Sequence, residues 1–592
     1  MKKLKKRSEI DKKYQWDLSG MISDDTQFDT TYKQVEKLTK QFIKYKGTLN
    51  KSANTIKKCL DDYATLMSIM ENLVVYSFMK GDEDNSNSKS QVDIGKAQQL
   101  MVKTETAVSF VEPELIKIDE KLLFDEKLFG YKTYIGDIVR RKKHTLSEKE
   151  ERILSMSQEA TSAPNEIFSM FNNADIKFGE IKDEEGNVVE LTKGRYIPFM
   201  ESKNRQVRKD AFTTMYTQYG KYKNTLAATY ISQIKTLKFY AKARNYESSL
   251  QASLDNDNVK EEVLDTLIST INENLPLMHR YIDMRAKALD LKTIDMYDIY
   301  VPIVEQTSEK YTYQQACNMV KDGLSILGED YVNLLNKAMT SKWIDVYENE
   351  GKTSGAYSWG TYLSHPYILL NFSGTLDSVY TLAHELGHSL HSYYSNHNQN
   401  YINSQYKIFV AEVASTVNEV LLLKHMLKIT TVKKKRAFLL NHFLESFRGT
   451  VFRQTMFTEY ERETNKSFND NKPLSADDLC NIYYDINSKY YGDTCKSDRL
   501  IKYEWARIPH FYMNFYVYKY ATGFLSAIAI VDMIEKEGEK AIIRYKDFLK
   551  SGGIDYPIEL LKKAGVDLTN KKPIEAGMKM FKEILDELEN LL

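Results

Sequence analysis

The chain has 592 residues, 42% of them hydrophobic, and its 82 basic and 82 acidic side chains give a formal net charge of zero. A chain of this length is too long to fold around one ordinary hydrophobic core, so we expect several domains or one elaborate helical body. The balanced charge creates no global field favouring nucleic acid or an anionic membrane, and we expect neither as a partner.

The N-terminal stretch MKKLKKRSEIDKKYQW is basic but is not followed by an apolar segment, so it does not predict a secretory signal. The longest apolar run, residues 524–531, is far too short to cross a bilayer. Cys59, Cys317, Cys480 and Cys495 show no CxxC spacing, which indicates neither a disulfide framework nor a thiolate metal site. We therefore expect a cytoplasmic protein.

Apolar residues recur at helical spacing over most of the chain, and only ten prolines interrupt it. Residues 30–50 show this spacing, as do residues 147–171, where Ser147 is the predicted N-cap. Residues 174–199 instead alternate apolar and polar positions around EEGN, which predicts a small β-hairpin. We expect a mainly α fold.

Along the chain, this pattern predicts three consecutive regions. Residues 1–110 form an N-terminal helical region, and residues 111–200 form a second helical region that ends in the hairpin. Residues 201–592 form the domain that carries the motif described below. Within this domain a Gly/Ser-rich loop leads into YILLNF, a predicted short strand, and a helix is expected to begin around residues 375–377.

That helix contains the run His384-Glu385-Leu386-Gly387-His388. Residues four apart lie on one helix face, about 6 Å from each other, because the rise is about 1.5 Å per residue. Both imidazoles can then bind one zinc ion, while the glutamate, about 100° around the helix, reaches a water molecule as general base. The alternative is a pair of hydrogen-bonded core histidines.

A catalytic zinc ion needs a third protein ligand and an open position. Position 394 is Tyr, so the pattern HExxHxxGxxH fails, and we interpret His391 as a neighbour of the site or a core residue. Glu412 is the carboxylate at the apolar centre of residues 407–423, and it must coordinate a metal or pair with a cation. Glu419, seven residues on, either orients a ligand histidine or is solvated.

HELGHSLHSYY followed by FVAEVASTVNE resembles the oligoendopeptidase F branch of the thimet-oligopeptidase-like zinc peptidases, family M3. YQWDLSGM, SGAYSWGTYLSHPYILLNFSGTLDSVYTLAHE and WARIPHFYMNFYVYKYATG also match, so the resemblance spans nearly the whole chain. It implies two helical halves around a deep substrate channel, with one zinc ion at its floor and a short β-sheet beside the zinc helix. It also implies cleavage of internal bonds in short peptides.

The resemblance implies the metal ligands His384, His388 and Glu412, with Glu385 as the general base. In this family a histidine and tyrosines near the C-terminus face the scissile carbonyl. His510 matches that histidine. Four tyrosines follow in the same stretch: Tyr512, Tyr516, Tyr518 and Tyr520. One helical face continued from His510 favours Tyr518, which we predict as the second hydrogen-bond donor.

Other interpretations of the motif differ in chemistry. One is a zinc-containing helical scaffold that binds peptides without cutting them, although a structural zinc ion usually has four protein ligands and no waiting base. Another is an aminopeptidase, for which the sequence upstream of His384 carries no G-x-M-E-N motif. In the peptidase interpretation, YILLNF pairs with substrate through an open strand edge, and SGAYSWG closes over the peptide.

Overall fold

The computed structural model describes residues 4–305 and 309–592, which are mainly helical with a few short strands. The expected mainly α fold is confirmed. The chain forms two compact units, each assembled from three segments. The first comprises the described residues up to Lys143, those from 309 to Lys428, and Ile530–Val566, and the second contains the remainder. These units cut across the regions 1–110, 111–200 and 201–592, which stay a prediction.

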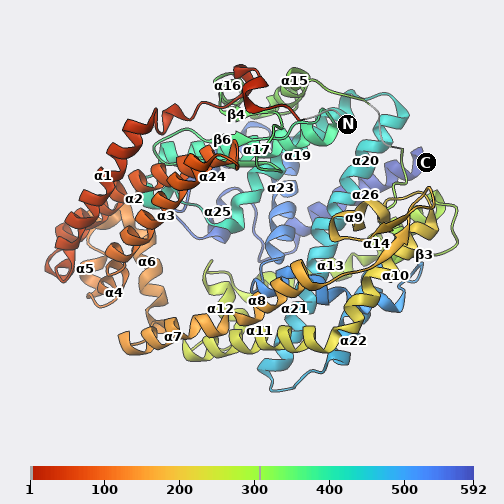
Figure 1. The fold of residues 1–592 in the computed structure, drawn as a ribbon, viewed down its shortest axis with the longest axis horizontal. Coiled ribbons are helices and arrows are strands. Elements are labelled where there is room, and N and C mark those ends of the chain that lie inside the picture. Colours follow the sequence, from red (N-terminus) through yellow and green to blue (C-terminus); the bar gives the residue numbers. More distant parts are fainter. Residues whose placement is uncertain (1–3, 306–308) are drawn as a thin grey trace. The chain divides into compact units, whose positions relative to one another are not determined.

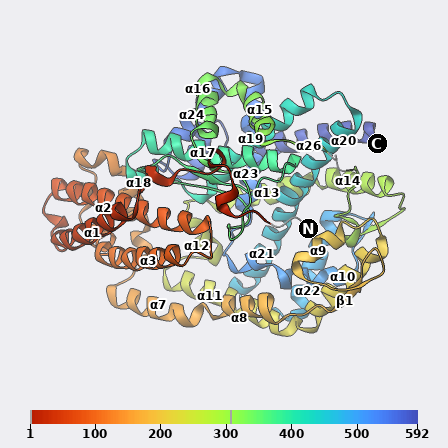
Figure 2. The same ribbon diagram turned by 45° about the horizontal axis from the view of Figure 1, so that its top comes forward.

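The first unit begins with a packed helical bundle, visible in Figures 1 and 2. Its three long helices are α1 (Asp25–Phe42), α2 (Ala53–Asp82) and α3 (Ser88–Val108). Each starts at a residue whose side chain accepts a backbone N–H of the first turn: Asp24, Ser52 and Asn87. Their apolar stripes form a common core around Val35 and Leu73.

The remaining helices of the first unit are α4 (Val111–Leu115), α5 (Glu120–Leu123), α6 (Lys132–Arg141), α15 (Tyr313–Gly323), α16 (Glu329–Thr340), α17 (Leu376–Asn398), α18 (Tyr401–Ser404), α19 (Ile408–Ile429), α24 (Glu539–Ser551) and α25 (Pro557–Lys563). Helix α17 packs against α15, α16 and α24. The long helix predicted to carry the metal motif is therefore enclosed by other helices, and it begins within the predicted range.

A three-stranded sheet lies against α17. Its strands are β4 (Ile344–Asp345), β5 (Tyr357–Trp359) and β6 (Tyr367–Leu369). Strand β6 corresponds to the predicted strand YILLNF and lies in the centre, parallel to β4 and antiparallel to β5. The prediction that β6 offers an open edge to substrate is therefore wrong, because both of its edges are paired. The two edge strands of the sheet are β4 and β5.

The second unit contains α7 (Glu148–Thr161), α8 (Ala163–Met170), α9 (Lys193–Met200), α10 (Arg205–Lys221), α11 (Lys223–Ala243), α12 (Ser249–Asp255), α13 (Glu261–Glu273), α14 (Leu275–Ala288), α20 (Lys433–Phe447), α21 (Arg453–Asn469), α22 (Ala476–Tyr491) and α26 (Lys572–Leu591). Helix α23 (Tyr518–Glu537) is divided between the units at Ala529. Ser147 caps α7, as predicted, in a capping box with Glu150.

The predicted β-hairpin is present in this second unit. Strand β1 (Glu180–Lys182) pairs antiparallel with β2 (Val188–Glu190), and Gly186 in the connecting turn has φ +84°. The sequence did not predict the short parallel pair of β3 (Ile294–Asp295) and β7 (Cys495–Lys496), whose partners are some two hundred residues apart. Among the described residues, no helix combines the length and the apolarity that crossing a membrane requires.

Candidate metal centre

Helix α17 presents His384 and His388 on one face. Thr375 caps the helix by accepting the backbone N–H of Ser378. The opposite face is buried and contains Val379, Leu382, Leu386 and Leu390. Because these apolar residues recur every three or four positions, they fix the rotation of the helix about its axis. The two histidines, one turn apart, are thereby held on the side that faces α19.

Gly387, inside the histidine motif, allows α19 to cross α17 closely. A Cβ atom at this position would lie 2.5 Å from Ser415 Cα and 2.6 Å from the Ala414 carbonyl oxygen. The crossing is also held by Asn418, whose Nδ2 donates to the Ala383 carbonyl at 3.0 Å. This close approach of the two backbones brings the first turns of α19 beneath the two histidines.

We expect Gly387→Ala both to destabilise the protein and to weaken its binding of the metal ion. The added methyl group meets backbone atoms of α19, which cannot move aside as a flexible side chain would. Overpacking of this kind costs typically about 1–3 kcal/mol. Thermal unfolding and zinc titration of the variant measure both effects. Normal zinc affinity in a destabilised variant would contradict the view that this crossing positions Glu412.

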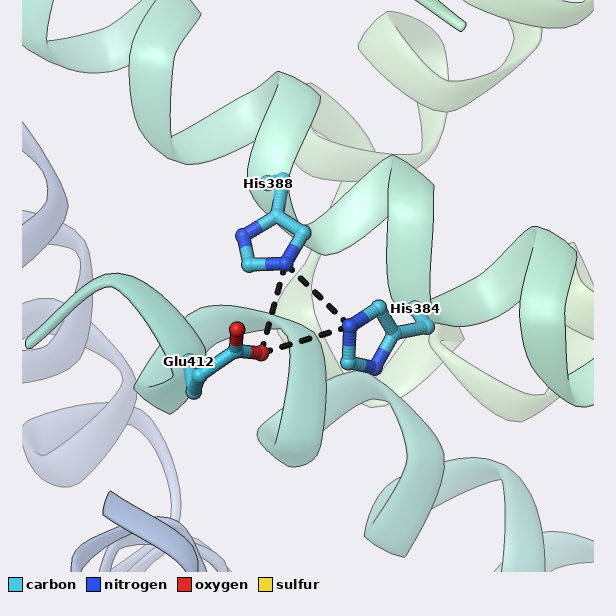
Figure 3. A group of neighbouring side chains, drawn as sticks. All are labelled: His384, His388 and Glu412. Carbon is cyan, nitrogen blue, oxygen red and sulfur yellow. Dashed lines mark hydrogen bonds and ion pairs between the residues drawn. The ribbon is translucent and has the colours of Figure 1, made fainter. Parts of the chain in front are cut away.

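The side chains of His384, His388 and Glu412 converge on one point, as Figure 3 shows. The Nε2 atoms of the histidines are 3.2 Å apart, and each lies 3.3 Å from Glu412 Oε2. Ser415 Oγ donates to the same carboxylate oxygen at 3.0 Å and restrains it. Ser415 was not predicted from the sequence, although a hydroxyl one turn after a glutamate in an apolar helix is a detectable signal.

These distances fit a zinc ion. Ligand atoms placed about 2.0–2.1 Å from a tetrahedral centre are separated from each other by about 3.3–3.4 Å. The three observed separations of 3.2, 3.3 and 3.3 Å match that triangle. A donor set of two imidazoles and one carboxylate is also typical of catalytic zinc. Only three protein ligands meet here among the described residues, which leaves a coordination position for water or substrate.

Glu385 is next to the first histidine and is only 7% exposed. Burial raises the pKa of its carboxyl, and the neighbouring His384 and His388 partly oppose that effect. Its Oε2 atom is buried and has no hydrogen-bond partner among the described residues. Burying a carboxylate oxygen without a partner lowers stability, so its presence calls for a functional explanation. An unoccupied acceptor atom of this kind is suited to accept a proton.

Glu419 contacts the other ring nitrogen of His384. Its Oε1 atom forms a hydrogen bond with Nδ1 of that histidine, which directs Nε2 toward Glu412. Burial of the ring disfavours its charged form, but hydrogen bonds that the ring donates to Glu412 and Glu419 outweigh burial and raise the pKa of His384 to about 10. Of the two interpretations of Glu419, the structure supports the first, because the carboxylate contacts His384.

His391 belongs to the core. Its ring is 1% exposed and stacks on Tyr406 with ring centroids 3.9 Å apart. Burial lowers the pKa of this imidazole to about 3, with a smaller contribution from His388. It is not a member of the metal-binding group. His391 lies on the same helix face one turn beyond His388, where its ring packs against Tyr406 and Phe548 instead of joining the two histidines.

A pocket of about 270 Å³ lies beside the start of α17. It is lined by Gly355, Ala356, Leu370, Asn371, Phe372, Ser373, Asp377, Ser378 and Thr381. Thr381 is one helical turn before Glu385, so the pocket extends along the same helix toward the metal-binding group. Strand β5 is tied to α17 by the hydroxyls of Ser358 and Ser389, whose oxygens are 2.7 Å apart.

The C-terminal candidates lie in the second unit. His510 belongs to a 3-10 helix, Pro509–Tyr512, and its half-buried ring has a pKa lowered by burial. The ring centroid lies 6.2 Å from that of Tyr516 and 5.9 Å from that of Tyr520, and these two tyrosine rings are 5.3 Å apart. Three side chains able to donate hydrogen bonds therefore form one group.

Tyr518, the tyrosine chosen from the sequence, is 1% exposed and packed in the core, where burial raises its pKa. The choice assumed one continuous helical face from His510. That assumption is wrong, because the 3-10 helix ends at Tyr512 and α23 begins only at Tyr518. Residues Asn514 and Phe515 between them have positive φ. The role of Tyr518 stays a prediction, and the geometry favours Tyr516 and Tyr520.

Comparison with known proteins supports the family resemblance over nearly the whole chain. Residues 198–580 match the model of peptidase family M3, and residues 114–178 match the model named oligopeptidase F. Oligopeptidase PepF of Bacillus subtilis is 45% identical over 99% of this chain and 88% of its own length. A solved Chlamydophila abortus protein has 33% identity, covers 100% of both chains and gives a TM-score of 0.94.

A solved oligoendopeptidase-F from Enterococcus faecium is 35% identical, covers 96% of this chain and 99% of its own, and gives a TM-score of 0.73. The chain therefore belongs to peptidase family M3, the class that the helical fold and the motif predicted. Within this family it belongs to the oligoendopeptidase F branch. The predicted enzyme class, a metalloendopeptidase, is confirmed at that level.

Proposed function

We propose that this protein is a zinc-dependent endopeptidase that hydrolyses internal bonds of short peptides. The observation that supports this most directly is the triangle of Nε2, Nε2 and Oε2 atoms with the unpartnered carboxylate oxygen of Glu385 on the same helix. His384, His388 and Glu412 would hold one zinc ion. We place the activity in the cytoplasm, since all four cysteines are free and buried, as suits a reducing compartment.

The chemistry divides between the metal and the protein. A bound zinc ion supplies Lewis acidity, which polarises a carbonyl and lowers the pKa of water toward about 7. Glu385 accepts the proton of the attacking water at Oε2 and then delivers it to the nitrogen of the leaving amine. The raised pKa of this carboxyl suits both steps, because the protonated form must donate near neutral pH. Glu419 holds the His384 ring in its ligating orientation.

An extended peptide has a place to bind next to this centre. Strand β5 is an edge strand of its sheet, and a substrate backbone can add to it through main-chain hydrogen bonds. Its link to α17 through Ser358 and Ser389 fixes that edge relative to the metal ligands. Main-chain pairing gives broad sequence tolerance, while the adjoining pocket near Thr381 accepts one side chain of the peptide.

The proposal is tested with a peptide whose N-terminus is acetylated and whose C-terminus is amidated, carrying a fluorophore and a quencher. The zinc-loaded enzyme is expected to cut it at an internal bond, located by mass spectrometry, and a chelator is expected to abolish the cleavage. Removal of single residues only from peptides with a free amine would indicate an aminopeptidase. Tight binding without cleavage, across several peptide sequences, would indicate a peptide-binding scaffold.

The C-terminal group provides the next test. We propose that His510 and a tyrosine donate hydrogen bonds to the developing oxyanion, and the ring distances favour Tyr516 or Tyr520 over Tyr518. Removing one such donor is expected to lower kcat roughly 10²–10³-fold with KM little changed. Kinetics of the three Tyr→Phe variants identify the residue. A large loss of kcat in Tyr518→Phe alone would support the assignment made from the sequence.

Glu419→Gln is expected to weaken zinc binding without removing a ligand. The amide retains the shape of the side chain but accepts the His384 N–H less strongly than a carboxylate does. Loss of such an outer partner typically reduces metal affinity about 10–100-fold. Competition with a zinc chelator of known affinity measures the change. Saturating zinc is expected to restore most of the activity, and failure to do so would assign Glu419 a different role.

A further inference from the structure

The segment between His510 and Tyr516 has an unusual backbone. Asn514 and Phe515 are consecutive residues with φ of 55° each, in the left-handed region that glycine adopts most readily. Residues other than glycine are strained in this region and persist there only when the surroundings enforce the conformation. Phe515 is also 1% exposed, so its side chain is fixed in the core while its backbone is strained.

A buried carboxyl group holds this turn. The backbone N–H of Phe515 donates to Glu461 Oε1 at 2.7 Å, and the bond is fully buried. Glu461 lies on α21 and is 1% exposed. Its second oxygen, Oε2, is buried and has no hydrogen-bond partner in the part of the chain that the structure describes. The adjacent Asn514 is held by a second bond, in which its Oδ1 accepts from Nε2 of the buried Gln233 at 3.1 Å.

The burial of the Glu461 carboxyl group lowers the stability of the fold, so stability does not explain its presence. Among the described residues no cation pairs with Glu461, and burial raises the pKa of its carboxyl to about 8, which the bond from Phe515 only partly offsets. A leucine of similar volume would fill the same space without the desolvation penalty. The carboxyl is therefore explained best by what it holds, which is the strained turn between two members of the His510 group.

We propose that Glu461 is a positioning residue of this peptidase: by accepting the Phe515 N–H it fixes the left-handed turn at Asn514 and Phe515, and thereby sets the placement of His510 relative to Tyr516 and Tyr520. The proposal rests on the proposed function of the His510 group. Without the acceptor, the turn relaxes to negative φ, and the path of the chain from the 3-10 helix to α23 changes. A displacement of about 1 Å in such a group can lower the rate about 10²-fold.

Two substitutions separate the acceptor from the charge. Glu461→Gln keeps an oxygen that accepts the Phe515 N–H, so kcat is expected to stay close to that of the wild type. Glu461→Leu removes the acceptor and keeps the volume, so kcat is expected to fall roughly 10²-fold with KM unchanged, because the affected donors act in the transition state. All kinetics are measured with the zinc-loaded enzyme on the blocked peptide, well below the Tm of each variant.

Glu459→Leu is the matched control. Glu459 lies on the same helix and is 8% exposed, but its carboxylate accepts from Tyr490 at 3.0 Å and from Lys489, away from the turn. This variant is expected to lower Tm and to leave kcat unchanged. An equal loss of kcat in both leucine variants would overturn the proposal, because general destabilisation would then explain it. Equal losses in Glu461→Gln and Glu461→Leu would also overturn it.

A crystal structure of Glu461→Leu decides the question independently of activity. The proposal requires that Phe515 leave the positive-φ region and that the His510–Tyr516 ring separation differ from 6.2 Å. An unchanged turn would overturn it. His510→Ala tests the oxyanion role of His510 separately from the role of Glu461. If this variant retains full kcat, the oxyanion role of His510 in the proposed function fails, while the variant structures still show whether Glu461 holds the turn.

Discussion

Glu385→Gln is expected to lower kcat by roughly 10²–10⁴-fold, the range that general acid–base catalysis contributes. The amide has nearly the same size as the carboxyl but accepts no proton in the pH range of the enzyme. Glu385 is not among the three convergent ligands, so zinc binding is expected to remain. Kinetics on the blocked peptide, together with the zinc content of each preparation, measure both properties.

Stability gives a second signature of this variant. The unpartnered Oε2 atom of Glu385 is a buried polar atom, and replacing the carboxyl with a neutral amide removes part of the cost of burying a charge. Glu385→Gln is therefore expected to unfold at a temperature no lower than the wild type. Full activity in a variant with one zinc ion per chain would disprove the role of Glu385 as base. Loss of both zinc and activity would assign it a structural part in the metal site.

Glu412→Ala is expected to abolish activity by removing the third ligand. The two histidines remain only 3.2 Å apart, but a site with two imidazoles lacks the carboxylate that completes the triangle. The loss of affinity should exceed the roughly 10–100-fold caused by losing an outer hydrogen-bond partner. Isothermal titration with zinc measures it directly.

Thermal unfolding with and without zinc provides the control for this prediction. A ligand present at 100 times its Kd stabilises the folded state by about 2.7 kcal/mol. Zinc is therefore expected to raise the Tm of the wild type. The Tm of Glu412→Ala is expected to change very little at the same zinc concentration. If the variant is stabilised by zinc as strongly as the wild type, Glu412 is not a ligand and another donor must complete the site.

Much of the site was predictable because its signals are local. The spacing of His384 and His388 is set by the pitch of one helix, and Glu385 follows from the same geometry. Glu412 was found because a carboxylate in an apolar helix requires a partner, and the structure brings it to the two histidines. The N-cap at Ser147 and the hairpin around Gly186 also depend on neighbours in sequence.

The features that sequence analysis missed depend on contacts between distant segments. Whether β6 is a central or an edge strand is decided by β4 and β5, and nothing in YILLNF itself reveals two partners. Ser415 acts through its position opposite Gly387 at a helix crossing. The tyrosine beside His510 could not be chosen by periodicity, because a strained turn interrupts the helix.

The family was predictable from the resemblance of several stretches, and the mainly α fold, the two histidines of the candidate metal site and the candidate base were predictable from helical periodicity and short-range spacing. The tertiary structure decided how α19 crosses α17 at Gly387, which strands form the edges of the sheet, and which aromatic rings lie near His510. These depend on burial and on backbone conformations enforced by remote groups. The bond from Phe515 to Glu461, which joins residues 54 positions apart, is the clearest instance.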